Sequence, residues 1–267
     1  DIITGGDAVD TIVGNAGADS ITGGAGDDII TGGDGTDTFN VDSGTDTVND
    51  LGGSSGGEND IVIISAGATV NANNIVSFVA TSATQNNSTD AGNAVLTAKS
   101  GAGRTISVAN ATGSSKAFTL VGSDGNDSLT GGAGDDIISV TSAGHANADI
   151  LDGGAGTDTL VLSSGTHTLT SENKIVNIEN INLSTSGSGT NVDLTGQTEA
   201  FTITAGNFAN TIKSGGGADT IVGGTNVDTI TGGAGDDIIT GGAGNDIITI
   251  DSGEDKVKDL GGTSGSE

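Results

Sequence analysis

Aspartate recurs at every ninth position in three stretches of the chain, and carboxylates held at one fixed spacing are candidate ligands for metal ions. The interval is unbroken in the first and third stretches, whereas in the second a four-residue insertion carrying His145 delays one member. The series consists of Asp1, Asp10, Asp19, Asp28, Asp37 and Asp46, then Asp127, Asp136, Asp149 and Asp158, and then Asp219, Asp228, Asp237, Asp246 and Asp255. Turns that contain Asp and Gly by chance would not keep one register over five consecutive intervals, so solvated turns alone do not explain the pattern.

Glycine occupies fixed places ahead of these aspartates. Units such as GGAGDDIIT at 23–31 and GGDGTDTFN at 32–40 follow the pattern Gly-Gly-x-Gly-x-Asp-x-apolar-x, in which the aspartate is position six. Glycine tolerates positive φ, so the first six residues can form a tight turn whose carbonyl oxygens point inward. The glycines at positions two and four that we expect to line such turns are Gly24, Gly26, Gly33, Gly35, Gly132, Gly134, Gly154, Gly156, Gly233, Gly235, Gly242 and Gly244.

A ring of backbone carbonyls completed by carboxylates favours calcium. Ca²⁺ accepts hard oxygen ligands in a flexible loop, whereas Mg²⁺ requires stricter octahedral geometry and Zn²⁺ prefers His or Cys. Acids outside position six, such as Asp7, Asp34 and Asp124, are expected to face solvent. The acids at position five, whose role the sequence leaves open, are Asp27, Asp135 and Asp236.

Short strands must position these ligands. The last three residues of each unit, x-apolar-x, predict a strand whose middle side chain faces the core. In the first stretch these core residues are Ile12, Ile21, Ile30, Phe39 and Val48. Two units per coil would wind a flattened parallel helix, in which turns on one side recur every eighteen residues and lie about 4.8 Å apart.

An ion can then lie between two turns that are eighteen residues apart, held by two carboxylates and by carbonyls from both turns. The predicted pairs are Asp1 with Asp19, Asp10 with Asp28, Asp19 with Asp37, Asp28 with Asp46, Asp136 with Asp158 across the insertion, Asp219 with Asp237, Asp228 with Asp246, and Asp237 with Asp255. With a few irregular sites added, we expect on the order of ten Ca²⁺ ions, which would offset roughly 20 negative charges.

The composition agrees with a thin, metal-supported fold. The 267 residues include 49 Gly and 5 Phe but no Pro, Cys, Met, Trp or Tyr, so the side chains that fill a thick core are missing. The net charge of -28 would make a compact chain repel itself unless a cation offsets it. Nucleic acid is excluded because the Lys/Arg surface that it needs is lacking. No apolar run is long enough for a membrane span, and no signal peptide is present. Because the chain has no Cys, disulfides cannot stabilise it, and a bound metal is the natural substitute.

Longer repeats organise the chain into blocks. Residues 210–267 align with 1–58 at an offset of 209, and a weaker repeat at an offset of 83 relates 112–119 to 195–202. We expect a calcium β-roll block at 1–58, a metal-poor β segment at 59–121, a calcium block at 122–161 with its insertion near 143–147, a metal-poor β-helix-like segment at 162–209, and a calcium block at 210–267 that repeats the first. The chain is expected to be a piece of a longer tandem array.

The metal-poor segments keep short β-branched runs and show no helical periodicity. Strands are predicted at Ile61 to Ile64, Asn74 to Thr81, Arg104 to Val108, Lys174 to Leu183 and Phe201 to Thr204. The predicted fold class is therefore all-β: a parallel β-roll or β-helix solenoid with calcium bound between stacked Gly-Asp turns.

Units such as GGAGDDIIT, GGAGNDIIT and GSDGNDSLT resemble the repeats-in-toxin (RTX, hemolysin-type) calcium-binding β-roll family. The resemblance is specific over about half of the chain. It implies export by type I secretion and folding in calcium-rich surroundings outside the cell. The tandem blocks, with Asn177 to Ile181 between two of them, are most similar to those of bacterial surface-layer, adhesin and filament proteins. An open β-stack presents strand edges that can join a neighbour, so we expect self-association into a polymer or array.

Several functions compete on this sequence. We favour an extracellular structural protein that is not an enzyme; the alternative is the repeat region of a secreted enzyme or toxin whose catalytic domain lies outside this chain. His145 and His167 are single, with no Cys and no zinc motif, and we expect both to be solvated loop or strand residues. An ice-binding face is disfavoured because position three shows no Thr/Asn ladder. Contact with a cell-surface polysaccharide stays open, although the aromatic platforms that such sites use are missing.

Overall fold

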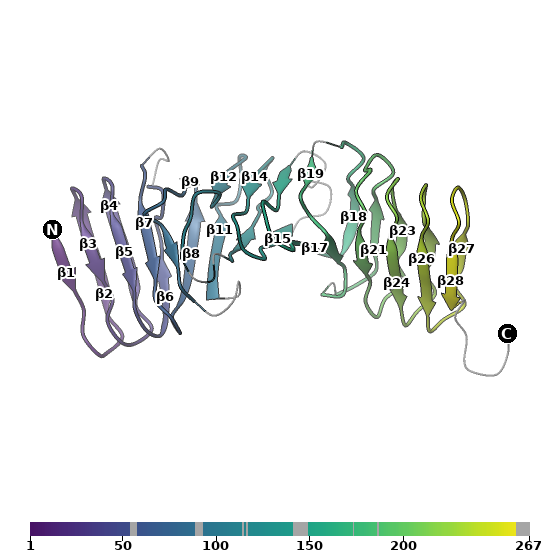
Figure 1. Ribbon diagram of the computed structural model, residues 1–267. Helices are drawn as coiled ribbons and strands as arrows, with labels where there is room; N and C mark the ends of the chain where they lie inside the picture. Colours follow the sequence, from purple (N-terminus) through teal and green to yellow (C-terminus); the bar gives the residue numbers. More distant parts are fainter. Residues whose placement is uncertain are drawn as a thin grey trace. The chain divides into compact units, whose positions relative to one another are not determined.

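The computed structural model describes residues 1–53, 58–88, 93–113, 115, 117–140, 149–172, 174–185 and 187–259. These residues form short β-strands and contain no α-helix. The strands pair in parallel and stack coil upon coil as a β-solenoid, which confirms the predicted fold class (Figure 1). The insertion with His145, expected near 143–147, and the end of the third block from residue 260 onward lie outside the described residues.

The chain forms two compact units. The first comprises Asp1–Ile138 and Leu151–Asp158, and the second comprises Ser139–Ile150 and Thr159–Glu267. The division into five segments by composition stays a prediction.

The described strands that lie wholly or partly in the first unit form three parallel sheets. One contains β1 (Ile2–Thr4), β3 (Ser20–Thr22), β5 (Thr38–Val41), β7 (Ile61–Ile64) and β10 (Gln85–Asn86). Another contains β2 (Thr11–Ala16), β4 (Ile29–Asp34), β6 (Thr45–Val48), β8 (Thr69–Ile75), β11 (Ala94–Ala98), β13 (Thr119–Val121) and β15 (Ile137–Val140). The remaining one contains β9 (Ser77–Val79), β12 (Thr105–Ser107), β14 (Ser128–Thr130) and β16 (Ile150–Asp152).

The described strands of the second unit stack in the same way. One row contains β17 (Thr159–Leu162), β20 (Asn180–Asn182), β22 (Thr202–Thr204), β24 (Thr220–Gly224), β26 (Ile238–Gly242) and β28 (Lys256–Asp259). The other row contains β18 (Gly165–Thr168), β21 (Thr190–Asp193), β23 (Thr211–Lys213), β25 (Thr229–Thr231) and β27 (Ile247–Thr249). The short strand β19 (Ile175–Val176) lies between β18 and β20 in the sequence.

Equivalent residues of successive coils pair at the predicted interval of eighteen residues. In the first unit Ile12 pairs with Ile30, and in the second Ile221 pairs with Ile239. These pairings confirm two nine-residue units per coil inside the repeat blocks. The coil that leaves the first block is longer, because Phe39 pairs with Val62, which is 23 residues further along the chain.

The core is narrow and built from the middle residue of each strand. Of the predicted core side chains, Ile21, Ile30, Phe39 and Val48 are fully buried, and Ile12 is 8% exposed. The flanking residues of each strand face outward, as the alternation of a pleated strand requires. The prediction of a thin core made of branched aliphatic side chains is therefore confirmed.

Two strands predicted in the metal-poor segments are broken by asparagines with positive φ. The strand β7 matches its prediction, Ile61 to Ile64. The predicted strand from Asn74 to Thr81 is instead split between β8 and β9, and Asn74 has a φ of 61°. The predicted strand from Lys174 to Leu183 is split into β19 and β20, with Asn177 at a φ of 53° between them. Asparagine adopts this conformation more readily than branched residues do, so it turns the chain at these corners.

Candidate metal centres

The aspartates at position six stack into columns along the solenoid. In each column the backbone N–H of one aspartate donates to Oδ1 of the aspartate eighteen residues further on. The distances are 2.8 Å from Asp10 to Asp28, 2.9 Å from Asp19 to Asp37, 3.0 Å from Asp28 to Asp46, 2.8 Å from Asp219 to Asp237, 2.9 Å from Asp228 to Asp246, and 3.1 Å from Asp237 to Asp255. The structure thus brings together the residues of these predicted pairs.

Two further predicted pairs show the same bond. Asp136 donates its N–H to Oδ1 of Asp158 over 2.7 Å, so the insertion between them does not break the column. The backbone nitrogen of Asp1 lies 2.5 Å from Oδ1 of Asp19, but the side chain of Asp1 is 85% exposed. Asp1 therefore reaches its partner through its backbone rather than through its carboxylate.

The second carboxylate oxygen is what makes these columns candidate metal centres. The Oδ2 atoms that are buried and have no hydrogen-bond partner include those of Asp19, Asp28, Asp46, Asp228, Asp237, Asp246 and Asp255. A buried carboxylate oxygen without a donor is costly in free energy. A bound cation would remove that cost, so the donor set fits an oxygen-loving ion.

A glycine at position one makes room for most of these carboxylates, although position one is Val41 before Asp46 and Ile250 before Asp255. A Cβ atom at Gly23 would lie 2.4 Å from Oδ2 of Asp28, and one at Gly232 would lie 2.2 Å from Oδ2 of Asp237. These contacts are too short for any side chain, because real Cβ atoms do not approach so closely. The predicted glycines were those of positions two and four, so the glycine of position one, with which the pattern begins, was not among them.

Glycines at positions two and four let successive turns approach closely. Gly24 has a φ of 102°, and a Cβ atom there would lie 2.1 Å from the carbonyl oxygen of Gly6 in the preceding coil. Of the predicted glycines, the ones with positive φ are Gly24, Gly26, Gly33, Gly35, Gly154, Gly156, Gly233, Gly235, Gly242 and Gly244. The expectation of positive φ is wrong for Gly132 and Gly134.

The turn that contains Gly132 belongs to a different class. Gly132 donates its N–H to Oδ2 of Asp136 in its own unit over 2.6 Å, and Gly6 donates likewise to Asp10 over 2.7 Å. In these turns the Oδ2 atom of the aspartate accepts the amide of position two in its own unit. Oδ2 of Asp127 likewise accepts the N–H of Ser123 (2.6 Å), and its Oδ1 accepts the N–H of Arg104 in another coil (2.7 Å). The predicted ligand Asp149 is buried, at 1% exposure.

Burial disfavours the charged form of these carboxylates. It raises the pKa of Asp136 from 3.8 to about 7, and the pKa values of Asp46 and Asp60 from 3.8 to about 6. Neighbouring carboxylates raise these pKa values further, whereas hydrogen bonds from backbone N–H groups lower them. The pKa values raised mainly by burial also include those of Asp37, Asp219, Asp228 and Asp237. A cation placed among the columns would offset this penalty and keep the carboxylates ionised.

Two members of the columns were missed in the sequence. Asp60 follows Asp37 in its column and accepts the N–H of Asp37 at Oδ1 over 2.8 Å, but its spacing of 23 residues falls outside the period of nine. Asn210 donates its N–H to Oδ1 of Asp228 over 2.8 Å, and its own Oδ1 accepts the N–H of Thr190 over 3.0 Å. The repeat at an offset of 209, which places Asn210 opposite Asp1, could have revealed it.

The acids at position five have a structural role of their own. Asp27 accepts the N–H of Thr45 over 2.8 Å, Asp135 accepts that of Thr157 over 2.8 Å, and Asp236 accepts that of Glu254 over 2.9 Å. They therefore bind the backbone of the following turn on the exposed side. The acids expected to face solvent, Asp7, Asp34 and Asp124, are exposed.

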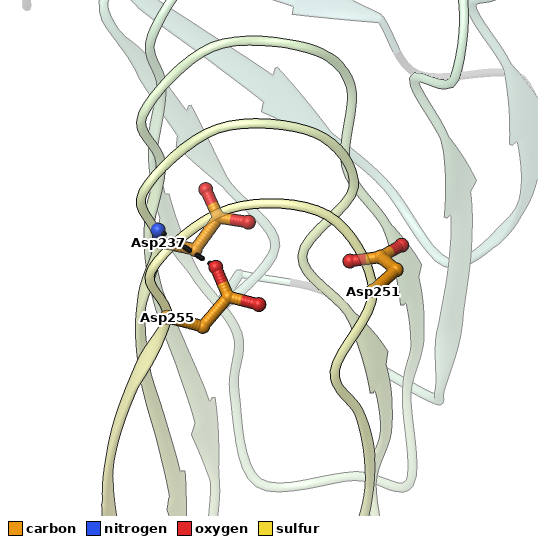
Figure 2. A group of neighbouring side chains, drawn as sticks. All are labelled: Asp237, Asp251 and Asp255. Carbon is orange, nitrogen blue, oxygen red and sulfur yellow. Dashed lines mark hydrogen bonds between the residues drawn. The ribbon is translucent and has the colours of Figure 1, made fainter.

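One site contains a third carboxylate. Asp237, Asp251 and Asp255 each offer an oxygen atom that lies within 4.8 Å of the other two. Figure 2 shows Asp237 and Asp255 on one limb of the turns and Asp251 on the other, with its carboxylate directed toward them. Oδ1 of Asp251 also accepts the N–H of Gly233 over 3.1 Å. Asp251 stands at position two, where the repeat pattern has glycine, so the nine-residue period did not predict it as a ligand.

His167 differs from its prediction. It lies on strand β18, but its side chain is fully buried rather than solvated. Nε2 lies 2.8 Å from the carbonyl oxygen of Ser163, and burial lowers the pKa of the imidazole. The alternation of the strand turns His167 inward, while its neighbours Thr166 and Thr168 are more exposed. His145 lies outside the described residues.

The family of the chain follows from its repeats. The described residues include no helix that is long and apolar enough to cross a membrane. The chain has no match among curated proteins. The family model of the RTX calcium-binding nonapeptide repeat (4 copies) matches residues 1–21, 13–48, 119–140, 141–166, 202–230 and 222–257, which together exceed half of the chain. The chain therefore belongs to the RTX calcium-binding nonapeptide repeat family.

Proposed function

We propose that this chain is a calcium-stabilised structural segment of an extracellular protein, in a surface layer, a filament or the stalk of an adhesin. The columns of buried Oδ2 atoms without hydrogen-bond partners carry this proposal. Cations along the columns of the first and third blocks would remove the free-energy cost of burying these oxygens. The segment folds when it meets calcium after secretion, and it then joins neighbouring copies or modules.

The ligands in this proposal are the carboxylates of the columns and the carbonyls of the adjoining turns. Each ion would lie between the two aspartates of a pair, such as Asp10 and Asp28 or Asp219 and Asp237, and bound calcium would supply the positive charge that lets their carboxylates stay ionised when buried. We assign the same role to the other aspartates and glycines predicted from the period. The glycines at position one have no side chain, and the carboxylates occupy the space that a side chain would fill. On the order of ten ions would bind and offset most of the net charge of -28.

Parallel stacking explains how such a segment could resist deformation. Within the repeat blocks, successive coils are bonded by strand pairing and by the N–H to Oδ1 bond of the columns. With an ion at each pair, two adjacent coils could separate only by breaking carboxylate contacts as well as backbone hydrogen bonds. This arrangement suits a stiff spacer, whose function depends on length and rigidity.

The alternative is a repeat region that accompanies the catalytic domain of a type I secreted enzyme or toxin. The same columns would serve it equally well, since calcium-triggered folding is useful to any such cargo. Contact with a cell-surface polysaccharide is a further proposal, which rests on the expected location alone.

Calcium titration followed by electron microscopy separates these proposals. Circular dichroism should show β-structure forming at roughly 0.1 to 1 mM calcium, the range of extracellular calcium sites. Light scattering and electron microscopy at saturating calcium should then show ordered polymers. A protein that folds with calcium but stays monomeric would favour the accessory repeat region. A chain whose β-signal does not respond to calcium or to a chelator would refute both.

A further inference from the structure

We propose that Asp251 is an affinity-determining third carboxylate, which makes the site of Asp237 and Asp255 the most negatively charged ion site in the third block and selective for trivalent over divalent cations. This inference rests on the proposed role of the columns as calcium sites. It adds a residue that the nonapeptide pattern does not contain, because position two is glycine in the two preceding units, Gly233 and Gly242.

The position of Asp251 is fixed by the backbone around it. Oδ1 of Asp251 accepts the N–H of Gly233, over 3.1 Å, in the turn eighteen residues earlier. Asp237 and Asp255 are linked to each other across the same two turns by the N–H to Oδ1 bond of the column, over 3.1 Å. The three carboxylates therefore approach one another from both limbs of two stacked turns, with oxygen atoms within 4.8 Å of one another (Figure 2).

A separate observation distinguishes this group from an exposed acidic patch. Asp237 is fully buried, and its Oδ2 atom has no hydrogen-bond partner. Oδ2 of Asp255 is also buried without a partner. Two carboxylate oxygens without donors beside a third carboxylate would repel one another strongly in a buried setting unless a cation lay between them. The carboxylate of Asp251 also contributes to the raised pKa of Asp237.

One member of this group lines a depression on the surface. A depression of about 310 Å³ runs along the outside of these turns, and its lining includes Gly233, Ala234, Asp251 and Ser252. Asp251 is exposed, whereas Asp237 is buried and Asp255 is partly buried. Asp251 is therefore the member of the group that is most open to solvent.

Charge count sets the selectivity. A pair such as Asp228 and Asp246 carries two negative charges, which one divalent ion neutralises. Three carboxylates leave one negative charge with a divalent ion and none with a trivalent ion of similar size. Coulomb attraction scales with the product of the charges. The ratio of trivalent to divalent affinity should therefore be roughly tenfold higher at the site with Asp251 than at a site with two carboxylates.

Paramagnetic displacement in the folded protein tests this directly. Calcium-saturated protein, labelled with ¹⁵N and assigned by NMR, would receive Gd³⁺ at well below one equivalent. The backbone amide signals of Gly233, Gly253 and Glu254 should broaden first in the wild type. The change Asp251→Asn should abolish this preference, so that broadening spreads over the other turns. Asp251→Gly, which restores the residue usual at position two, should do the same. Both variants start from calcium-saturated protein, and circular dichroism would verify that they are folded.

A matched control removes the same charge elsewhere. Asp34 is an exposed acid at position three, so Asp34→Asn should leave the order of broadening unchanged. Equal broadening at all turns of the wild type, or an unchanged order in both Asp251 variants, would overturn the role of Asp251 while leaving the calcium columns intact. A wild-type protein that takes up no calcium at all would instead overturn the proposed function on which this inference rests.

Discussion

A single column of the first unit contains both carboxylates and apolar side chains at equivalent places. Its members in order of pairing are Asp10, Asp28, Asp46, Val70, Ala94, Phe118 and Asp136. The parallel strands on either side continue without interruption through the change from Asp to Val and back. The three apolar members, Val70, Ala94 and Phe118, are fully buried. Stacking of coils therefore does not require carboxylates, and what the carboxylates add is a requirement for cations.

The two regions hold successive coils together by different means. In the apolar stretch, stacked side chains exclude water, which stabilises each coil without any ligand. In the aspartate stretch, buried Oδ2 atoms such as that of Asp28 make the metal-free coil unfavourable until an ion binds. The solenoid can thus make one part of its length conditional on calcium while the neighbouring part keeps its packing.

Chelation of calcium should separate the two regions most clearly. If calcium is present at about 100 times its dissociation constant, each site contributes about 2.7 kcal/mol, so removal should lower amide protection about 100-fold per site. We expect this loss at residues 20–48, and a change of less than about tenfold at residues 94–107. Hydrogen exchange measured by mass spectrometry with and without a chelator would check it. Equal loss of protection in both stretches would mean that the apolar stretch has no stability of its own.

Truncation of an apolar member should destabilise the chain without loss of ions. Phe118→Ala empties a fully buried site and should lower the free energy of unfolding by about 3–5 kcal/mol. Phe208→Ala is the matched control, because Phe208 is 41% exposed, and it should cost less than about 1 kcal/mol. Denaturation in saturating calcium gives the free energies, and calorimetry gives the number of ions. A reduced number of ions in Phe118→Ala would contradict the separation of the two mechanisms.

A methyl group at position one should act on the carboxylate region alone. Gly23→Ala would place Cβ 2.4 Å from Oδ2 of Asp28, which must then move out of its place in the column. We expect a loss of about 2 kcal/mol and a lower number of bound ions. Gly187→Ala has no atom within 4 Å of the added Cβ and no positive φ, so it serves as the control. Unfolding curves and calcium titration of both variants would measure the difference.

The dependence of stability on pH should reverse when calcium is removed. Without metal, Asp46 and Asp136 in the folded chain hold protons up to a pKa of about 6 and about 7, whereas in the unfolded chain they lose them near 3.8. The metal-free fold is therefore most stable below pH 4 and loses this stability as the pH rises to 7. With calcium, protons compete with the ion, so acid destabilises the fold instead.

Thermal melts would show this reversal. The midpoint of the metal-free protein should rise by about 3 °C or more between pH 7.5 and pH 4, and that of the calcium-saturated protein should fall. Val70, Ala94 and Phe118 have no group to titrate in this range. After correction for the intrinsic pH dependence of hydrogen exchange, the protection of amides beside them should therefore change little with pH. A change in protection there as large as at Asp46 would contradict the comparison.

The period of nine residues was enough to predict the columns. It fixed which residues turn inward, and from the pairing of coils it placed Asp19 next to Asp37 and Asp219 next to Asp237, as the N–H to Oδ1 bonds confirm. It could not select Asp60, because a longer coil precedes that residue, or Asp251, because that residue replaces a glycine. A period describes what repeats, whereas both of these ligand candidates arise where the repeat is broken.

Other features depend on three-dimensional contacts that no spacing reveals. The role of glycine at position one follows from the place of the Asp28 carboxylate over Gly23. The burial of His167 follows from the alternation of a strand whose register was not predicted. The corners at Asn74 and Asn177 depend on single residues with positive φ, within segments that otherwise look like continuous strands.

Anomalous X-ray scattering from crystals grown in millimolar calcium tests the central claim most directly. We predict a row of calcium peaks along each column, in contact with the Oδ2 atoms that have no donor in the protein, among them those of Asp28, Asp46 and Asp237. Well-ordered turns with these oxygens bonded only to water, and without an anomalous peak between paired aspartates, would contradict the account.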